Sequence, residues 1–172
     1  VQLLEAVHEI DEIRRIRFTS PHPIGYKEDV IEAFTYLPKL VDHVHYPMQS
    51  GSDRILKRMR RPYKAQRFID ICDRMKEARP DIAISTDIIV GFPGETEADY
   101  LETRKAVEHV QFDQAYIFRY SKRKDTPAAE MDEQLPEQIK EERNQDLLGI
   151  VNEIVAKKNE NLVGTTQEVL CE

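Results

Sequence analysis

The chain has 172 residues, of which 40% are hydrophobic and 33% charged, and this balance predicts one folded, water-soluble domain and excludes a disordered chain. No apolar stretch approaches the roughly 20 residues of a membrane-spanning helix, and residues 1–5 lack a secretory signal, so we expect no membrane partner and a cytoplasmic location. Only Cys72 and Cys171 occur, which excludes a disulfide framework and a cysteine-rich metal site within this chain.

The net charge of −7 is unevenly distributed. Residues 1–86 carry 15 Lys and Arg against 13 Asp and Glu, whereas residues 87–172 carry 10 against 19, so the halves have net charges of +2 and −9. Seven Lys and Arg lie within residues 54–67, and such a density suits contacts to nucleic-acid phosphates. A solvated helix face is the alternative interpretation of this run.

Apolar periodicity and breaker residues predict alternating helices and strands. The predicted helices are residues 3–10, 30–37, 65–78, 96–110 and a long one that starts at Pro136 and frays near Gly164. The predicted strands are residues 15–19, 43–46, 82–90 and 113–120. Helical crossovers between four strands give a parallel sheet, so an α/β fold is expected, as either a barrel or an open doubly wound sheet.

Polar and glycine residues follow the strands, where such folds build ligand sites. Ser20 is held between two prolines, and Gln49 and Ser50 offer an amide and a hydroxyl for a ribose or an amino acid, with a helix cap as the alternative for this loop. Asp87 lies in an otherwise apolar strand and needs a partner, either a ligand or a protein group. Gly91 would let the backbone approach a flat ligand closely.

A second basic segment follows the last predicted strand. Lys122 and Arg123 stand in residues 120–127 (YSKRKDTP), where their charges would either meet phosphates or balance the acidic second half of the chain. No residue in the sequence is assigned as a catalytic acid, base or nucleophile, and none as a metal ligand.

Four motifs occur in a fixed order along nearly the whole chain. They are residues 17–23 (RFTSPHP), 45–52 (HYPMQSGS) continuing to 59–63 (MRRPY), 85–96 (STDIIVGFPGET), and 120–121 (YS) with 126–129 (TPAA). This series resembles the radical S-adenosylmethionine methylthiotransferases, and within that family it is most similar to the branch that acts on N6-dimethylallyladenosine in tRNA.

The resemblance implies a partial radical-SAM (βα) barrel of which this chain supplies the last four parallel strands with their flanking helices. Residues 1–160 would be the C-terminal two-thirds of the barrel domain, and residues 161–172 the truncated start of a small β-barrel (TRAM-like) RNA-binding domain. The family carries two [4Fe–4S] clusters on cysteines that have no counterpart in Cys72 or Cys171. We therefore expect a fragment of a larger enzyme that binds no cofactor stably on its own and is inactive alone.

The resemblance also implies a reaction. In this family a radical derived from S-adenosylmethionine activates C2 of N6-isopentenyladenosine at tRNA position 37, and a methylthio group is transferred there; the protein mainly positions the cofactor. Candidate cofactor-binding residues are Ser20, Gln49, Ser50, Asp87 and Gly91. Candidate RNA-binding residues are Arg58, Arg61, Lys122 and Arg123.

Two other functions remain open at this stage. A methylthiotransferase that acts on N6-threonylcarbamoyladenosine in tRNA is the nearer one, and a fragment that docks RNA without catalysis is the other. A barrel without its first strands would also leave an edge unpaired at residues 15–19, so the isolated chain is predicted to self-associate by pairing through that edge or by exchange of residues 169–171. Protection of the edge by the predicted helix at residues 3–10 is the alternative.

Overall fold

The computed structural model describes residues 1–18 and 23–166 of the chain. The predicted helices and the last three predicted strands occur in the predicted order, with an additional short helix and two short 3-10 turns between them. The helices are α1 (Gln2–His8), α2 (Glu28–Tyr36), α3 (Asp53–Arg58), α4 (Ala65–Ala78), α5 (Glu97–Val110) and α6 (Glu137–Glu160). The strands are β1 (His43–His45), β2 (Ala83–Val90) and β3 (Gln114–Arg119), and the 3-10 turns are η1 (Pro23–Gly25) and η2 (Pro127–Glu130).

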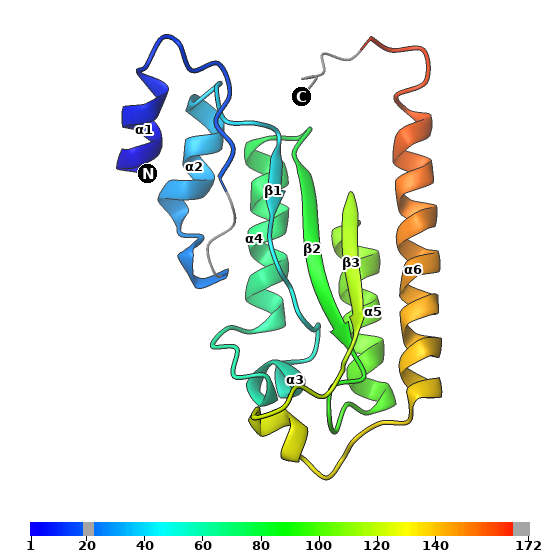
Figure 1. The fold of residues 1–172 in the computed structure, drawn as a ribbon. Helices are drawn as coiled ribbons and strands as arrows, with labels where there is room; N and C mark the ends of the chain where they lie inside the picture. The colour runs from blue at the N-terminus through cyan, green and yellow to red at the C-terminus, as the bar shows by residue number, and fades with distance from the viewer. Residues whose placement is uncertain (19–22, 167–172) are drawn as a thin grey trace.

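The strands form one parallel sheet in the order β1-β2-β3 (Figure 1). Val44 pairs with Ile84, and Asp87 pairs with Tyr116, which fixes the register of both neighbours of β2. A further parallel bridge between Gln49 and Ile88 continues the pairing beyond the end of β1. The predicted parallel α/β fold is thus confirmed, as an open three-stranded sheet rather than a closed barrel.

The prediction of a first strand at residues 15–19 is wrong for the part of it that the structure describes. Ile16 makes a single parallel bridge to Leu40, in which the Ile16 N–H donates to Lys39 and the Ile16 carbonyl accepts from Val41. These partners lie in the loop before β1 begins, so no ladder extends along the segment. Phe18 is held instead by its ring contacts with Tyr26 and Phe34, at centroid distances of 6.5 and 6.2 Å.

The two faces of the sheet differ. Helices α4 and α5 cover one face (Figure 1), where Ile84, Ile88 and Val90 are fully buried. Within this core the ring of Tyr46 stacks on Phe68 of α4 at 4.2 Å between centroids. Because side chains alternate along a strand, the opposite face of β2 carries Ser85, Asp87 and Ile89 instead, and it is not covered by a helix in the described structure.

Helix α6 lies along β3 at the edge of the sheet (Figure 1). The Asn144 side chain donates to the carbonyl oxygen of Ile117 in β3 across 2.8 Å. Farther along the helix, Lys158 binds Asp113 at the start of β3, with 2.8 Å between Nζ and Oδ1. The apolar stripe that the sequence predicts for this helix contributes Leu147 and Val151 to the core.

Local signals explain where several helices start and stop. A capping box starts α5, since the Thr96 hydroxyl accepts from the Asp99 N–H and the Asp99 carboxylate accepts from the Thr96 N–H. Helix α4 has the predicted bounds and ends before Pro80. The basic run of residues 54–67 is not one helix, because it is divided between α3, a turn and the start of α4.

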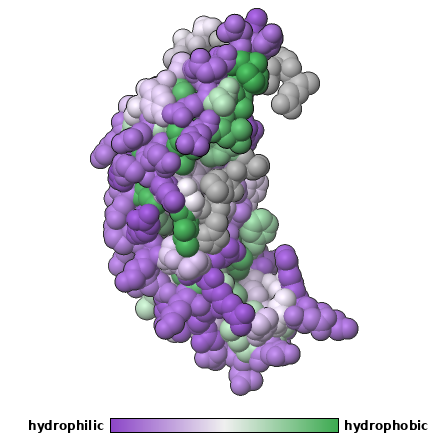
Figure 2. All heavy atoms as spheres, turned by 90° about the vertical axis from the view of Figure 1, so that its left-hand side faces the viewer, coloured by the Kyte–Doolittle hydropathy of each residue, from purple (hydrophilic) through white to green (hydrophobic). Residues whose placement is uncertain are grey.

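Seen from the side of α1 and α2, the molecule has a bowed outline and a largely hydrophilic outer surface (Figure 2). Apolar side chains reach the surface in the middle of this view, among the hydrophilic ones. Among the described helices, none has both the length and the apolar character needed to cross a bilayer.

Candidate functional site

Two adjoining hollows lie where the strands end. The first, named here the Asp87 pocket, has a volume of about 330 Å³, and the second, the Met131 pocket, about 260 Å³. Gln49 and Ile89 line both. The Asp87 pocket is completed by Asp87, Phe118, Arg119, Tyr120, Ser121 and Arg123. The Met131 pocket is completed by Arg58, Met59, Arg60, Arg61, Phe92, Thr126, Pro127, Ala128 and Met131.

Gln49 stands between the two hollows because of its backbone. Its N–H donates to the Asp87 carbonyl at 2.7 Å and its carbonyl accepts from the Ile89 N–H at 2.9 Å, so residue 49 is fixed against β2. Its φ of 66° is left-handed, a conformation that non-glycine residues seldom adopt. The amide that the sequence singles out is thereby brought beside Asp87, as predicted for strand ends that meet at one edge.

Asp87 has the protein partner that its setting requires. Its Oδ2 lies 3.2 Å from Nε2 of His45 on the neighbouring strand. The Nδ1 of His45 lies 2.9 Å from the Ser85 hydroxyl, which in turn lies 3.1 Å from Nε2 of His43. A line of four polar side chains therefore runs along the open face of the sheet toward the Asp87 pocket.

Tyr120 lines the same pocket, but its hydroxyl lies beneath the pocket surface. Its phenolic oxygen is buried and has no hydrogen-bond partner in the described part of the chain. Burial raises the pKa of Tyr120, which keeps the phenol protonated. Its ring meets that of Phe92 edge to face at 5.2 Å. Because this oxygen has almost no accessible surface, a ligand in the pocket would meet other atoms of Tyr120 and not its hydroxyl.

The other predicted cofactor residues have different surroundings. Ser50 is fully buried and lines neither pocket; its hydroxyl lies 3.3 Å from that of Thr103 and accepts from the Ser52 N–H at 3.2 Å. Gly91 has a φ of 71°, and a Cβ there would lie 2.4 Å from Cγ of Lys140. The close approach at Gly91 is therefore to α6. Ser20 lies outside the described residues.

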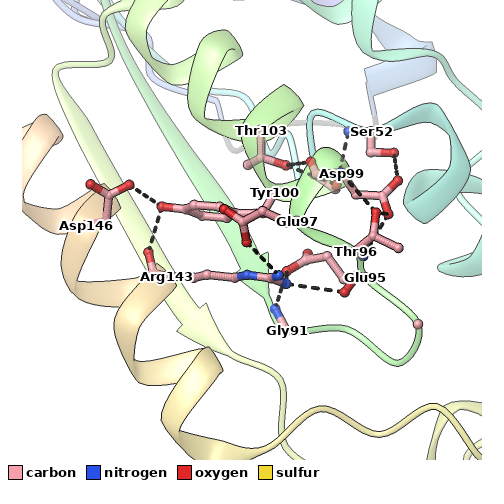
Figure 3. A network of polar contacts seen from close by, with 12 residues as sticks. Ser52, Gly91, Glu95, Thr96, Glu97, Asp99, Tyr100, Thr103, Arg143 and Asp146 are labelled. Carbon is pink, nitrogen blue, oxygen red and sulfur yellow. Dashed lines mark hydrogen bonds and ion pairs between the residues drawn. The ribbon is translucent and has the colours of Figure 1, made fainter.

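The loop that contains Gly91 is fixed by a buried ion pair (Figure 3). The Glu95 carboxylate accepts from the Gly91 N–H at 2.8 Å and from Nη1 of Arg143 at 2.6 Å. Burial raises the pKa of Glu95, and the hydrogen bonds from Gly91 and Arg143 oppose this effect. Arg143 also binds Glu97 through Nη2 at 3.1 Å, so one arginine of α6 holds both ends of the turn into α5.

The basic run is only partly available to a ligand. Arg54 donates to the Asp99 carboxylate, and Arg58 is ion-paired with Glu133 and has a side chain that is 26% exposed. Arg60 is exposed and Arg61 half-buried, and both line the Met131 pocket. Of the second basic segment, Arg123 lines the Asp87 pocket, whereas Lys122 is exposed in the loop beside it.

The described residues do not fit an iron–sulfur cluster. They contain no group of three or more His, Cys, Asp or Glu side chains placed to hold a metal ion. Cys72 is buried in the core on α4, and burial raises the pKa of its thiol, which disfavours the thiolate that binds metals. Cys171 lies outside the described residues.

Several residues of this site are missed by reasoning from the sequence. His45 lies in a recognised motif, yet its pairing with Asp87 depends on the register of β1 against β2. The sequence does contain a signal for the neighbours of His45, because side chains alternate along a strand and Ser85, Asp87 and Ile89 therefore lie on one face of β2. Tyr120 lies in the motif at residues 120–121, but its burial, like the partner of Arg143, depends on packing between distant segments and could not be predicted from the sequence.

Comparison with known proteins gives the family. A profile of the Radical SAM superfamily matches residues 1–107. The chain is 70% identical over all 172 residues to the tRNA-2-methylthio-N(6)-dimethylallyladenosine synthase of Akkermansia muciniphila, and 53% and 52% identical to the proteins of that name from Methylacidiphilum infernorum and Opitutus terrae. Each match covers 100% of this chain but only 38%, 37% and 36% of the length of the respective relatives.

A solved structure supports the same fold. Coproporphyrinogen III oxidase from Escherichia coli, a radical SAM enzyme, matches with a TM-score of 0.61 at 16% identity, over 77% of this chain and 31% of the oxidase. The resemblance that the four sequence motifs indicate is confirmed. The chain belongs to the radical SAM superfamily.

Proposed function

We propose that the protein of which this chain forms part methylthiolates C2 of N6-isopentenyladenosine at position 37 of tRNA by radical S-adenosylmethionine chemistry. The observation that carries the proposal is the 70% identity over all 172 residues to a relative named for the synthesis of that nucleoside. Membership of the superfamily supports a radical reaction, and the names of the relatives indicate the substrate. A tRNA substrate favours a cytoplasmic location.

Within that protein, residues 1–160 would form the later part of the barrel and residues 161–172 the start of an RNA-binding β-barrel. The two [4Fe–4S] clusters of the proposed enzyme would be held by parts of the protein other than the described residues, which provide no ligands for them. In this proposal the described residues do not contact the clusters.

The Asp87 pocket fits S-adenosylmethionine, which supplies the radical that acts on the substrate. A carboxylate and an amide from Asp87 and Gln49 line it together, beside the apolar side chains of Ile89 and Phe118. These groups suit a ligand that carries hydrogen-bond donors, such as ribose hydroxyls or an ammonium group, together with a flat ring. In this arrangement His45 orients Asp87.

The experiment that tests the function uses the full-length protein, reconstituted anaerobically with iron and sulfide. It is incubated with S-adenosylmethionine, a reductant and tRNA that carries N6-isopentenyladenosine, and the nucleosides are analysed by mass spectrometry. A methylthio group gained on that nucleoside is expected. Modification of N6-threonylcarbamoyladenosine alone, or of neither nucleoside, would refute the proposal.

The cofactor site is tested by calorimetry, which measures the binding of S-adenosylmethionine to the full-length reconstituted protein and its variants. Asp87→Asn should weaken binding about tenfold or more, because it removes a charge-assisted hydrogen bond. Asp81→Asn is the matched control, since Asp81 is exposed at the opposite end of β2. Equal affinities for the two variants would place the cofactor elsewhere.

A further inference from the structure

The Met131 pocket has an apolar floor beside the proposed cofactor site. Its floor consists of Ile89, Phe92, Pro127, Ala128 and Met131, contributed by β2, the loop after it and the segment around η2. Because Gln49 and Ile89 line this pocket and the Asp87 pocket alike, groups bound in the two hollows would be neighbours. Such adjacency is what a reaction between a cofactor and a second ligand requires.

Backbone strain is concentrated around this pocket. Gln49 and Arg60, with φ of 66° and 56°, line it, and Asp125, with φ of 62°, directly precedes the lining residue Thr126. The described residues contain one other non-glycine residue with positive φ, Gln111, which ends α5. Strained conformations of this kind cluster where a protein must hold groups for a ligand.

The charges at the rim define the other end of the ligand. Arg58 is neutralised by Glu133, and its Nη2 lies 3.6 Å from the sulfur of Met131, so it holds the floor in place. Arg60 and Arg61 have no acidic partner of this kind in the described structure; both line the pocket, and Arg60 is exposed. The pocket therefore suits a ligand with a small apolar group inside and phosphates outside.

We propose that the Met131 pocket receives the branched five-carbon group on N6 of the target adenosine, that Ala128 and Met131 set its size, and that Arg60 and Arg61 face the neighbouring phosphates. This inference rests on the proposed function and assigns the residues that would recognise its substrate. A threonylcarbamoyl group would instead bring a carboxylate against the apolar floor, where it would lose its hydration.

The test measures binding of the full-length reconstituted protein to two anticodon stem-loops that differ only in the presence of the dimethylallyl group. The wild type should prefer the modified RNA about tenfold to hundredfold, because the group buries apolar surface. Ala128→Leu should fill the pocket and reduce this preference to about threefold or less, with unchanged affinity for the unmodified RNA. Ala129→Leu is the control, since Ala129 lies on the same turn outside the pocket and should keep the preference.

A second variant tests the same pocket in the opposite direction. Met131→Ala enlarges the floor, so binding of RNA that carries N6-benzyladenosine should improve relative to the dimethylallyl RNA. A wild-type preference that Ala128→Leu leaves intact, or a benzyl RNA that gains nothing from Met131→Ala, would overturn the inference. If the inference about the pocket is overturned but the wild-type protein methylthiolates the modified RNA, the proposed function survives. If the wild-type protein modifies no RNA, both proposals fail.

Discussion

Arg143 of α6 donates to Glu95 of the loop after β2 at 2.6 Å, and the two side chains are 7% and 1% exposed. This contact joins the last long helix to the loop whose residue Phe92 lines the Met131 pocket. The same arginine stands over the ring of Tyr100 at 5.2 Å, so its position is fixed on two sides (Figure 3). The shape of the loop therefore depends on a helix about 50 residues away in sequence.

Removing this arginine should be costly. Arg143→Ala leaves the Glu95 carboxylate buried without its charged partner, and we expect the free energy of unfolding in urea to fall by about 3–5 kcal/mol. Arg104→Ala breaks a partly exposed pair with Asp146 on the same side of α6 and should cost no more than about 1 kcal/mol. Equal losses for the two variants would contradict the assigned role of the buried pair.

Two glycines should respond to alanine in opposite directions. Gly91→Ala forces a left-handed φ on alanine and places its Cβ against Lys140, so it should destabilise the protein by about 1–3 kcal/mol. Gly149 lies within α6 with open space around it, and Gly149→Ala should stabilise by about 0.5–1 kcal/mol. Thermal unfolding of both variants decides the matter, and a stabilised Gly91→Ala protein would disprove this account of the loop.

Lowering the pH should reduce the stability that Asp99 contributes at the start of α5. Burial alone would raise the pKa of Asp99, but hydrogen bonds from Arg54, Ser52 and Thr96 outweigh it and hold the pKa well below its usual 3.8. Since the folded pKa is depressed, the stability that Asp99 contributes is complete above pH 3.8 and is lost as the pH falls toward the lower value.

Asp99→Asn tests this effect. At neutral pH it should lower the free energy of unfolding by about 1–3 kcal/mol, and below pH 4 its stability should fall less steeply with pH than that of the wild type. Urea titrations between pH 3 and 7 measure both quantities. Parallel acid profiles for the two proteins would show that Asp99 does not titrate as described.

Two of the three arginines predicted to bind RNA, Arg58 and Arg61, should differ in their contribution to binding. Arg61 lacks the acidic partner that Arg58 has in Glu133, so Arg61→Ala should reduce the salt dependence of tRNA binding by about one unit of slope. Arg58→Ala should change the slope less. Fluorescence titrations of the full-length protein over a salt series measure both slopes. An unchanged slope for Arg61→Ala would show that Arg61 faces solvent and does not contact a phosphate.

This 172-residue chain alone should not assemble a cluster. The described residues offer no metal site, and the buried thiol of Cys72 resists the loss of its proton. Anaerobic incubation with iron and sulfide should therefore leave no stable [4Fe–4S] absorption or stoichiometric iron, and no cleavage of S-adenosylmethionine. A stoichiometric cluster would mean that Cys72 or Cys171 ligates metal.

Patterns that depend on near neighbours in sequence were predictable, and patterns that depend on packing were not. The capping box at Thr96 and the end of α4 follow from local hydrogen bonding and from Pro80. The strand at residues 15–19 failed because a β-branched or aromatic segment becomes a strand only if a partner runs beside it, and Ile16 meets a loop.

The candidate site shows the same division. Gln49 and Asp87 were identifiable because strand ends converge, and they do line one pocket. Ser50 carried the same signal, yet its hydroxyl turns toward Thr103 on α5, which no pattern within its own segment reveals. The binding roles of all nine candidate residues stay predictions.

The side-chain amide of Asn144 has a consequence for how copies of this chain could associate. By donating to the Ile117 carbonyl it occupies the outer edge of β3, so an incoming strand would first have to displace α6. Addition of strands is then restricted to the side of β1. Because residues 15–18 form no strand, the self-association predicted at residues 15–19 would have to use β1 instead. Each copy then has one free strand edge, and that edge is used up when two copies pair. The assembly would therefore stop at a dimer and not extend into a fibre.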